Sequence, residues 1–217
     1  MKISHLLYKV NHLERAMEKF KKKGFKVEYG SKTKPHNALI YFSEGPYIEL
    51  LEKAPLSLFA KIILTLIGQT KVVQRLQSWE MAEEGFFELC LENQQTHFKR
   101  EEQIFKAYGQ DYFITKSNRR DIYNRQLTWQ LLFPLEKGLP FLMTYFNLDP
   151  KPKNFIHPNG AIRIKQVSFG IETKFIPIIK ELCDDTILEF SSGKRIGKVL
   201  FEEVKMTKKG PNSTITI

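Results

Sequence analysis

Three ionisable side chains stand inside segments of the sequence that are rich in leucine, isoleucine and phenylalanine and read as strands. They are His5, Glu49 and Glu88. An ionisable group in such a strand must be paired, bind a metal or face a wet cavity, because burying an isolated charge is costly. A histidine with two carboxylates is a recognised donor set for Zn²⁺, Ni²⁺, Mn²⁺ or Fe²⁺. The alternative is that each side chain points to solvent from the polar face of a half-exposed sheet.

Four further residues are candidates for contact with a substrate. His36 precedes a strand in a proline-containing loop, and His157 lies in a His-Pro-Asn-Gly turn. Histidine can serve there as a contact or as a general acid or base near neutral pH. Arg125 and Trp129, on or just before a later strand, could hold an anion and stack on a flat ligand. The alternatives are surface histidines, a surface arginine and a packing tryptophan.

The segments that carry these residues repeat in a fixed order. The first copy reads strand, helix and three strands, over residues 3–10, 13–23, 25–29, 37–42 and 47–51. The second copy covers residues 86–92, 94–108, 112–115, 127–133 and 139–146. Gly24 and Gly109 end the two helices, as a left-handed C-cap would. A shorter third copy covers residues 167–171, 175–183, 186–190 and 197–204.

These repeats predict an α+β protein with five segments along the chain. A first βαβββ unit occupies residues 1–53, a helical insertion 54–83, a second βαβββ unit 84–149, a shortened βαββ unit 150–207 and a flexible tail 208–217. The insertion has apolar residues at helical spacing. It is either a helix pair that packs on the core, or a lid over a pocket or a dimer contact. A lid or a dimer contact would explain the apolar residues Ile62, Ile63 and Leu64.

The repeated βαβββ order resembles the vicinal-oxygen-chelate superfamily, and within it the glyoxalase-like group. The resemblance rests on short motifs between residue 3 and about residue 171: Ser4-His5-Leu6, His36-Asn37-Ala38-Leu39-Ile40, Tyr47-Ile48-Glu49-Leu50, Leu139-Pro140-Phe141-Leu142 and His157-Pro158-Asn159-Gly160-Ala161. It implies that the units form a cup-shaped, partly open barrel sheet around a binding site. A metal, where the family has one, is held by the first and last strands of each unit.

The resemblance also implies which residues would hold such a metal. His5 and Glu49 match the ligand positions of the first unit, and sliding the second unit over the first sets Glu88 opposite His5. The same alignment sets Met143 opposite Glu49, where a thioether is a poor ligand for hard or borderline ions. A metal at His5, Glu49 and Glu88 would therefore lack its fourth ligand. Glu49 or Glu88 would double as the catalytic base.

Three functions remain open at this point. The first two start from a cup that binds a small organic molecule. The first is a metal-dependent lyase, isomerase or dioxygenase in which the ion stabilises an oxyanion. The alternative is a metal-free protein that binds or sequesters a small ligand. A second alternative is a basic interaction scaffold, suggested by the formal net charge of +10.

Composition limits the cofactors and partners. The lysines are dispersed and do not alternate with stacking aromatic residues, so nucleic acid is not the expected partner. A homodimer stays an open alternative. The absence of a glycine-rich phosphate loop argues against a nucleotide cofactor. No run approaches the roughly 20 apolar residues of a spanning helix, so we expect no membrane partner. Two cysteines without metal or disulfide spacing and a start without a leader predict a cytoplasmic protein.

Overall fold

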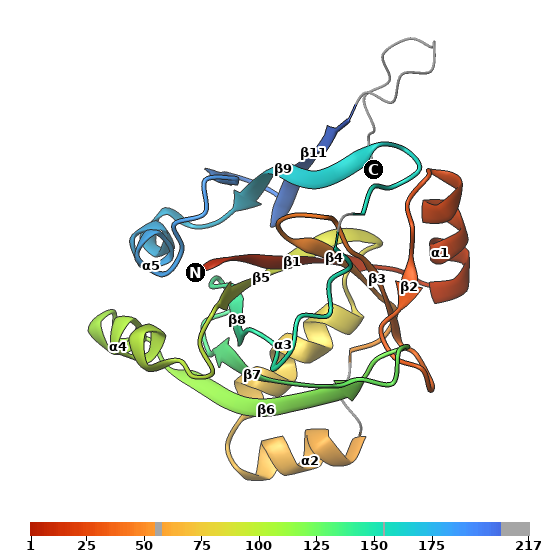
Figure 1. Cartoon of the computed structure of the whole chain (residues 1–217). Helices are drawn as coiled ribbons and strands as arrows, with labels where there is room; N and C mark the ends of the chain where they lie inside the picture. The colour runs from red at the N-terminus through yellow and green to blue at the C-terminus, as the bar shows by residue number, and fades with distance from the viewer. Residues whose placement is uncertain (55–57, 154, 205–217) are drawn as a thin grey trace.

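A mixed sheet of eight strands curls into a partly open cup in the computed structural model, which describes residues 1–54, 58–153 and 155–204 (Figure 1). The strands lie in the order β2-β3-β4-β1-β5-β8-β7-β6. The first repeat supplies β1 (Lys2–Lys9), α1 (Leu13–Lys22), β2 (Glu28–Tyr29), β3 (Asn37–Ile40) and β4 (Tyr47–Leu51). The second repeat supplies β5 (Gly85–Asn93), α4 (Lys99–Ala107), β6 (Tyr112–Arg120), β7 (Gln126–Pro134) and β8 (Phe141–Thr144). The predicted α+β class and cup-shaped sheet are confirmed.

The two repeats join through their first strands. β1 and β5 pair antiparallel, with His5 opposite Cys90 and Leu7 opposite Glu88. Within each repeat the first strand pairs parallel with the last, β1 with β4 and β5 with β8. The pairing inside one chain therefore relates the two halves of the cup by an approximate two-fold axis.

Strand alternation divides the buried residues between the two faces of the sheet. On β1, Leu6 and Tyr8 pack in the core that includes α1, whereas Leu7 packs in a second cluster with Cys90 and Phe141 on the concave side. Successive side chains of a strand point to opposite faces, so each strand serves both layers. This is why β1 is buried along almost its whole length.

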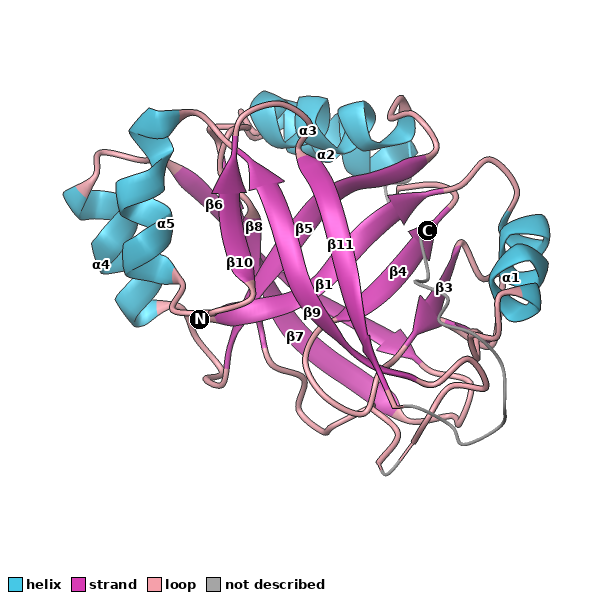
Figure 2. Ribbon diagram, turned by 90° about the horizontal axis from the view of Figure 1, so that it is seen from above, coloured by secondary structure: helices cyan, strands magenta, loops and turns pink. Residues whose placement is uncertain are grey.

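The third repeat forms a separate sheet on the opposite side from the cavity. It contains β9 (Ala161–Gly170), α5 (Ile176–Leu182), β10 (Leu188–Ser191) and β11 (Ile196–Glu203), with β9 in the centre (Figure 2). Val167 and Phe169 of β9 belong to the same buried cluster as Leu6 and Leu89. The small sheet thus covers the apolar residues that the cup presents on its outer face.

The helical insertion covers the mouth of the cup. Its helices are α2 (Leu58–Leu66) and α3 (Thr70–Glu80), and α3 packs Leu76 and Trp79 into the concave-side cluster. α2 lies outside α3 and leaves Leu66 80% exposed (Figure 1). A dimer contact through this exposed face stays a prediction.

Several elements differ from their predicted bounds, among them β9, which begins at Ala161 and not at residue 167. α4 begins at Lys99 and not at residue 94, because the side chain of Asn93 holds the preceding loop by accepting from the amide of Gln95 and donating to the carbonyl of His97. β6 continues to Arg120, five residues beyond its predicted end. The left-handed ends of α1 and α4 are confirmed, because Gly24 and Gly109 have φ values of 80° and 61°.

Some predicted segments fall outside the described residues, namely 55–57 of the insertion, 205–207 of the third unit and the whole tail 208–217. None of the helices in the described ranges is long and apolar enough to cross a membrane.

An ion pair fastens the third repeat to the second. Arg195, in the β10–β11 turn, donates from Nη2 to Glu88 Oε1 at 2.9 Å and to Oε2 at 3.2 Å. Arg195 Nη1 also donates to the carbonyl of Gly138 at 2.6 Å. Because Glu88 is only 5% exposed, its charge depends on this guanidinium.

Replacing Arg195 should therefore destabilise the fold. In Arg195→Met we expect the free energy of unfolding to fall by about 3 kcal/mol, because Glu88 is left buried without a counterion. The double variant Arg195→Met/Glu88→Gln should recover much of this loss, since no charge then needs a partner. Urea denaturation measures both, and an unfolding midpoint that does not move in Arg195→Met would contradict the role of the pair.

His157 gives the fold a pH dependence. The ring is fully buried against Phe25, Phe42 and Phe155, and its Nδ1 accepts the amide of Lys26 at 2.9 Å. Burial lowers the pKa of His157 from 6.5 to about 4. Between these values the unfolded chain binds a proton that the folded chain does not, so stability falls as the pH drops from about 6.5 to 4.

In His157→Asn this part of the pH dependence should be absent. Asparagine keeps an acceptor for the Lys26 amide but does not titrate, so between pH 7 and pH 4 the variant should lose on the order of 2 kcal/mol less stability than the wild type. Urea denaturation at several pH values measures the difference. Parallel curves for the two proteins would show that His157 is not responsible.

Candidate functional site

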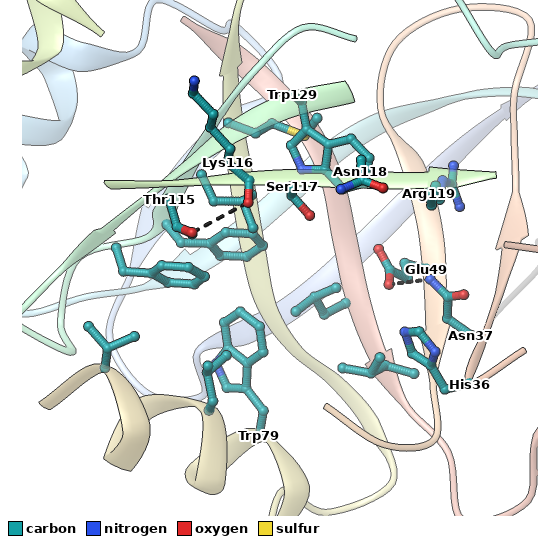
Figure 3. Close-up of a pocket in the computed structure, with 18 of the residues that line it drawn as sticks. His36, Asn37, Glu49, Trp79, Thr115, Lys116, Ser117, Asn118, Arg119 and Trp129 are labelled. Atoms are coloured by element: carbon teal, nitrogen blue, oxygen red, sulfur yellow. Dashed lines mark hydrogen bonds between the residues drawn. The ribbon is translucent and has the colours of Figure 1, made fainter. Parts of the chain in front are cut away.

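A cavity of about 520 Å³ lies on the concave side of the sheet, between the strands and the two insertion helices (Figure 3). Most of its wall is apolar or aromatic, including Leu7, Trp79, Trp129, Phe133, Phe141 and Met143. Those that lie on strands share the cavity because they occupy alternate positions on neighbouring strands, whereas Trp79 reaches it from α3. Phe59, Ile63 and Leu64 of α2 also line it. This placement agrees with the predicted role of the insertion as a cover over a pocket.

One end of the cavity is polar. Figure 3 shows His36, Asn37, Glu49 and Arg119 gathered there, away from Trp79. Asn37 on β3 donates from Nδ2 to Glu49 Oε1 on β4 at 2.7 Å. Since β3 and β4 are adjacent strands, the sheet itself fixes the position of the carboxylate.

Arg119 reaches this end from the opposite edge of the sheet. It lies on β6, whereas its partners follow β2 and β3: Nη1 donates to the carbonyl of Gly30 at 2.9 Å, and Nη2 donates to the hydroxyl of Tyr41 at 3.1 Å. Because β6 and β2 are the two edge strands, these contacts show that the curl brings the edges together. The guanidinium is thus both part of the closure and part of the cavity wall.

His5 lies beside Glu49 and is uncharged at neutral pH. Its Nε2 is 3.6 Å from Glu49 Oε2, its Nδ1 is 3.0 Å from the hydroxyl of Ser4, and its ring stacks on Tyr47 with centroids 4.7 Å apart. Burial lowers the pKa of His5 to about 4, against the attraction of Glu49. Burial also raises the pKa of Tyr41 to about 12. The groups in direct contact with Glu49 and Arg119 are thus an amide, an imidazole, a carbonyl and a phenol, and no ion pair joins the two side chains.

Comparison with known proteins places the chain in a family. The model of the glyoxalase-like domain family matches residues 3–174. The chain belongs to the glyoxalase-like domain family. The resemblance drawn from the short sequence motifs is thereby confirmed. No curated protein matches this glyoxalase-like chain.

One solved structure supports the fold of the glyoxalase-like chain. A hypothetical protein from Staphylococcus aureus is similar with a TM-score of 0.64 and 18% identity, covering 95% of this chain and 92% of that one. Glyoxalase I from Zea mays is more distant, with a TM-score of 0.37 and 15% identity over 84% of this chain and 56% of that one. This chain therefore spans little more than half of the maize enzyme. The comparison with the Staphylococcus protein shows the fold alone.

Four of the predicted site residues of this glyoxalase-like protein line the cavity: His5, His36, Glu49 and Trp129. Glu88 does not join them. The antiparallel register sets Cys90 opposite His5, and Glu88 forms its ion pair with Arg195 instead. His5, Glu49 and Glu88 therefore do not converge as the sequence had predicted. The alignment of the two repeats by sequence did not take the strand register into account.

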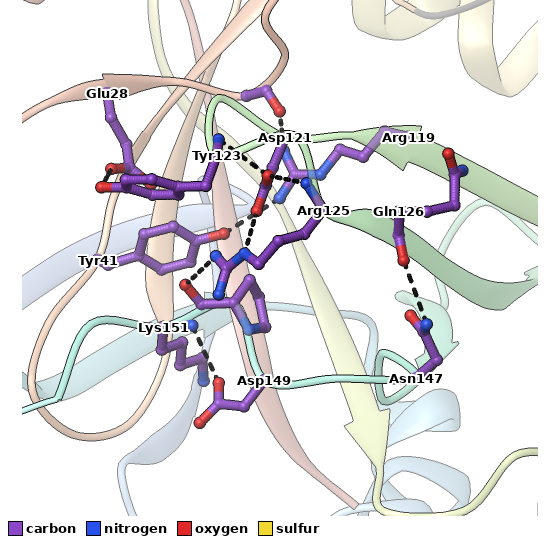
Figure 4. A network of polar contacts seen from close by, with 12 residues as sticks. Glu28, Tyr41, Arg119, Asp121, Tyr123, Arg125, Gln126, Asn147, Asp149 and Lys151 are labelled. Atoms are coloured by element: carbon purple, nitrogen blue, oxygen red, sulfur yellow. Dashed lines mark hydrogen bonds and ion pairs between the residues drawn. The ribbon is translucent and has the colours of Figure 1, made fainter.

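Arg125 and His157 also lie away from the cavity wall. Arg125 donates from Nε to Asp121 Oδ2 at 2.7 Å and from Nη2 to the carbonyl of Pro150, so it fixes the β6–β7 turn (Figure 4). His157 is packed in the aromatic core described above. Neither residue of the glyoxalase-like chain is placed to contact a ligand in the cup, contrary to the expectation from the sequence.

The donor chemistry at the cup does not fit a divalent metal. The positions related to His5 and Glu49 by the approximate two-fold axis hold Cys90 and Met143. Cys90 is fully buried, and burial raises the pKa of its thiol well above the ordinary value, which disfavours the thiolate form. Met143 is a thioether whose Sδ accepts from Ser4. Across the described ranges, no three His, Cys, Asp or Glu side chains converge as a metal site would require.

Arg119 is the site residue that sequence reasoning missed. The predicted strand ended at Thr115, because the residues that follow are all polar and carry no apolar alternation. The available signal was positional: Phe113, Thr115, Ser117 and Arg119 share one face of β6, and all four line the cavity. Asn37 is part of the motif His36-Asn37-Ala38-Leu39-Ile40, but the sequence did not predict its contact with Glu49.

We expect divalent metals to leave the stability of this glyoxalase-like chain unchanged. Thermal unfolding with Zn²⁺, Ni²⁺ or Mn²⁺ should give the same Tm as without metal, because one imidazole and one carboxylate beside a guanidinium do not make a site. Elemental analysis of protein purified without a His tag should find no stoichiometric metal. A metal retained by the wild type and by His12→Ala, but lost in His5→Ala and Glu49→Ala, would contradict the conclusion that the cup does not fit a divalent metal.

Proposed function

We propose that this protein binds a small organic molecule in the cup through its own side chains, without a metal. The cavity of about 520 Å³ supports this, because ligand sites fall in the range of about 300–1,000 Å³. Such sites are mostly apolar with a few placed polar groups that fix the orientation of the ligand. The cavity of this protein has that composition, and this observation carries the proposal: its wall is largely aromatic, with Glu49, Asn37 and Arg119 at one end.

The donor set favours this reading over a metal-dependent lyase, isomerase or dioxygenase. Those reactions need an ion that holds substrate oxygens and stabilises an oxyanion. Here His5 and Glu49 lack two further suitable ligands, since Cys90 and Met143 occupy the related positions. The polar groups that remain are suited to direct contact with a ligand.

A scaffold for nucleic acid is less well supported by the described residues. The wall of the cavity is mostly apolar or aromatic, whereas a groove for a nucleic-acid strand is lined by many basic side chains. Family membership does not decide between binding and catalysis, because one fold carries many functions. The proposal therefore rests on the cup of this chain.

Intrinsic fluorescence tests the proposal directly. The chain has two tryptophans, Trp79 and Trp129, and both line the cavity. Titration with propylbenzene, which has an apolar body and no polar group, should change their emission in a saturable way. The physical reason is that the probe replaces water beside both indole rings.

A filled cavity provides the control for this titration. Ser117→Phe places a ring in the cavity wall and should weaken propylbenzene binding, whereas Ser192→Phe, in the exposed β10–β11 turn, should bind as the wild type does. An unsaturable response, or equal affinity in Ser117→Phe and the wild type, would refute binding in the cup.

A further inference from the structure

Two opposite charges at the polar end of the cup have no direct counterion. Glu49 accepts from the amide of Asn37 at 2.7 Å, its Oε2 lies 3.6 Å from His5 Nε2, and no described lysine or arginine forms an ion pair with it. Arg119 donates to a carbonyl and to a phenol, both uncharged. Among the described residues, no ion pair joins Glu49 to Arg119 or either of them to another side chain of opposite charge.

Arg119 also carries an unused donor. Its Nε is buried and has no hydrogen-bond partner within the described ranges. A buried donor without a partner is unfavourable, so an acceptor supplied by a ligand would stabilise this guanidinium. The guanidinium lies over the ring of Phe146, 5.9 Å from its centroid, at the border between the polar end and the aromatic wall.

The positions of both charged groups are fixed before any ligand arrives. Asn37 orients the carboxylate, while Gly30 and Tyr41 hold the guanidinium from two segments. Gly30 is required there, because a Cβ atom would collide with Asn37 Oδ1 and lie 2.9 Å from Arg119 Nη1. A head group that meets both charges would therefore bind without reorganising them.

We propose that the ligand of the cup is a zwitterion, with an amine for Glu49 and a carboxylate for Arg119 a few bonds apart on an aromatic or branched apolar body. An apolar α-amino acid or a derivative of one has this chemistry. The inference rests on the proposed function, since it names the head group of the molecule that the cup binds. The apolar body would lie against Phe133, Phe141 and Trp79.

Charge balance distinguishes this head group from simpler ones. A ligand with only a carboxylate would leave the charge of Glu49 without a partner and would bring a second negative charge beside it. A ligand with only an amine would leave the charge of Arg119 without a partner and would bring a second positive charge beside it. A neutral head group would leave both charges unpaired. A zwitterion satisfies both with charge-assisted hydrogen bonds and adds no net charge to the buried end.

Four probes with one phenyl body separate these cases. They are 2-amino-4-phenylbutanoate, 4-phenylbutanoate, 3-phenylpropylamine and propylbenzene, which carry both groups, the carboxylate, the amine and neither. Their Kd values can be measured from the tryptophan emission of the wild-type chain. The zwitterion should bind at least about tenfold more tightly than each of the other three.

Two variants assign the contacts and a third serves as a matched control. Arg119→Gln should weaken the two probes that carry a carboxylate and spare the two that do not. Glu49→Gln should weaken the two probes that carry an amine and spare the others. Arg125→Gln removes a guanidinium from the neighbouring turn, outside the cup, and should leave all four Kd values unchanged. Circular dichroism of each variant verifies that it is folded.

The outcomes separate this inference from the proposed function. Equal Kd values for all four probes, or variants that weaken all four alike, would overturn the zwitterion while leaving the cup as an apolar binding site. If even propylbenzene fails to bind in the cup, the proposed function fails and the inference fails with it.

Discussion

The antiparallel pairing of β1 with β5 is the interaction on which the cup depends. It joins the two repeats within one chain, and its register sets His5 opposite Cys90. β4 pairs in parallel with β1 on one side of this pair, and β8 pairs in parallel with β5 on the other side. Glu49 on β4 and Met143 on β8 therefore occupy positions related by the approximate two-fold axis. The same strands bury apolar residues on both faces, so the cup and the layer outside it are stabilised together. A change of register by one residue would turn His5 and Leu7 away from the cavity.

The closure of the cup then explains why its polar end is where it is. The curled sheet does not close by backbone hydrogen bonds between its edge strands, since β2 and β6 end the strand order. Side chains bridge the edges instead, with Arg119 donating to Gly30 and Tyr41. A charged group that stabilises closure is thereby held in the wall of an apolar cavity, close to Glu49. Recognition of a charged head group follows from the way the sheet is completed.

The fold was predictable from the sequence to a larger extent than the site. Alternating apolar residues and the glycines at 24 and 109 predicted the repeated elements, because strand and helix patterns are local. His5 and Glu49 were placed at the cavity by the family resemblance. Glu88 was misplaced because its partner, Arg195, comes from the third repeat, and nothing local in the sequence shows that long-range ion pair. Arg119 was missed because the second half of β6 is polar on both faces, so its sequence does not show which face meets the cavity. Only the curl of the sheet, a long-range feature, turns one of these faces toward the cavity.

A crystal structure of the wild-type chain with 2-amino-4-phenylbutanoate, recorded with anomalous diffraction, tests the central claim most directly. That claim is that the cup holds its ligand by direct contact with protein groups. It predicts the ligand carboxylate within hydrogen-bond distance of Arg119 Nε, the amine beside Glu49 and the phenyl ring against the aromatic wall, with no anomalous peak at His5. An anomalous peak for a metal ion bound by His5 and Glu49, with the ligand coordinated to it, would contradict the account.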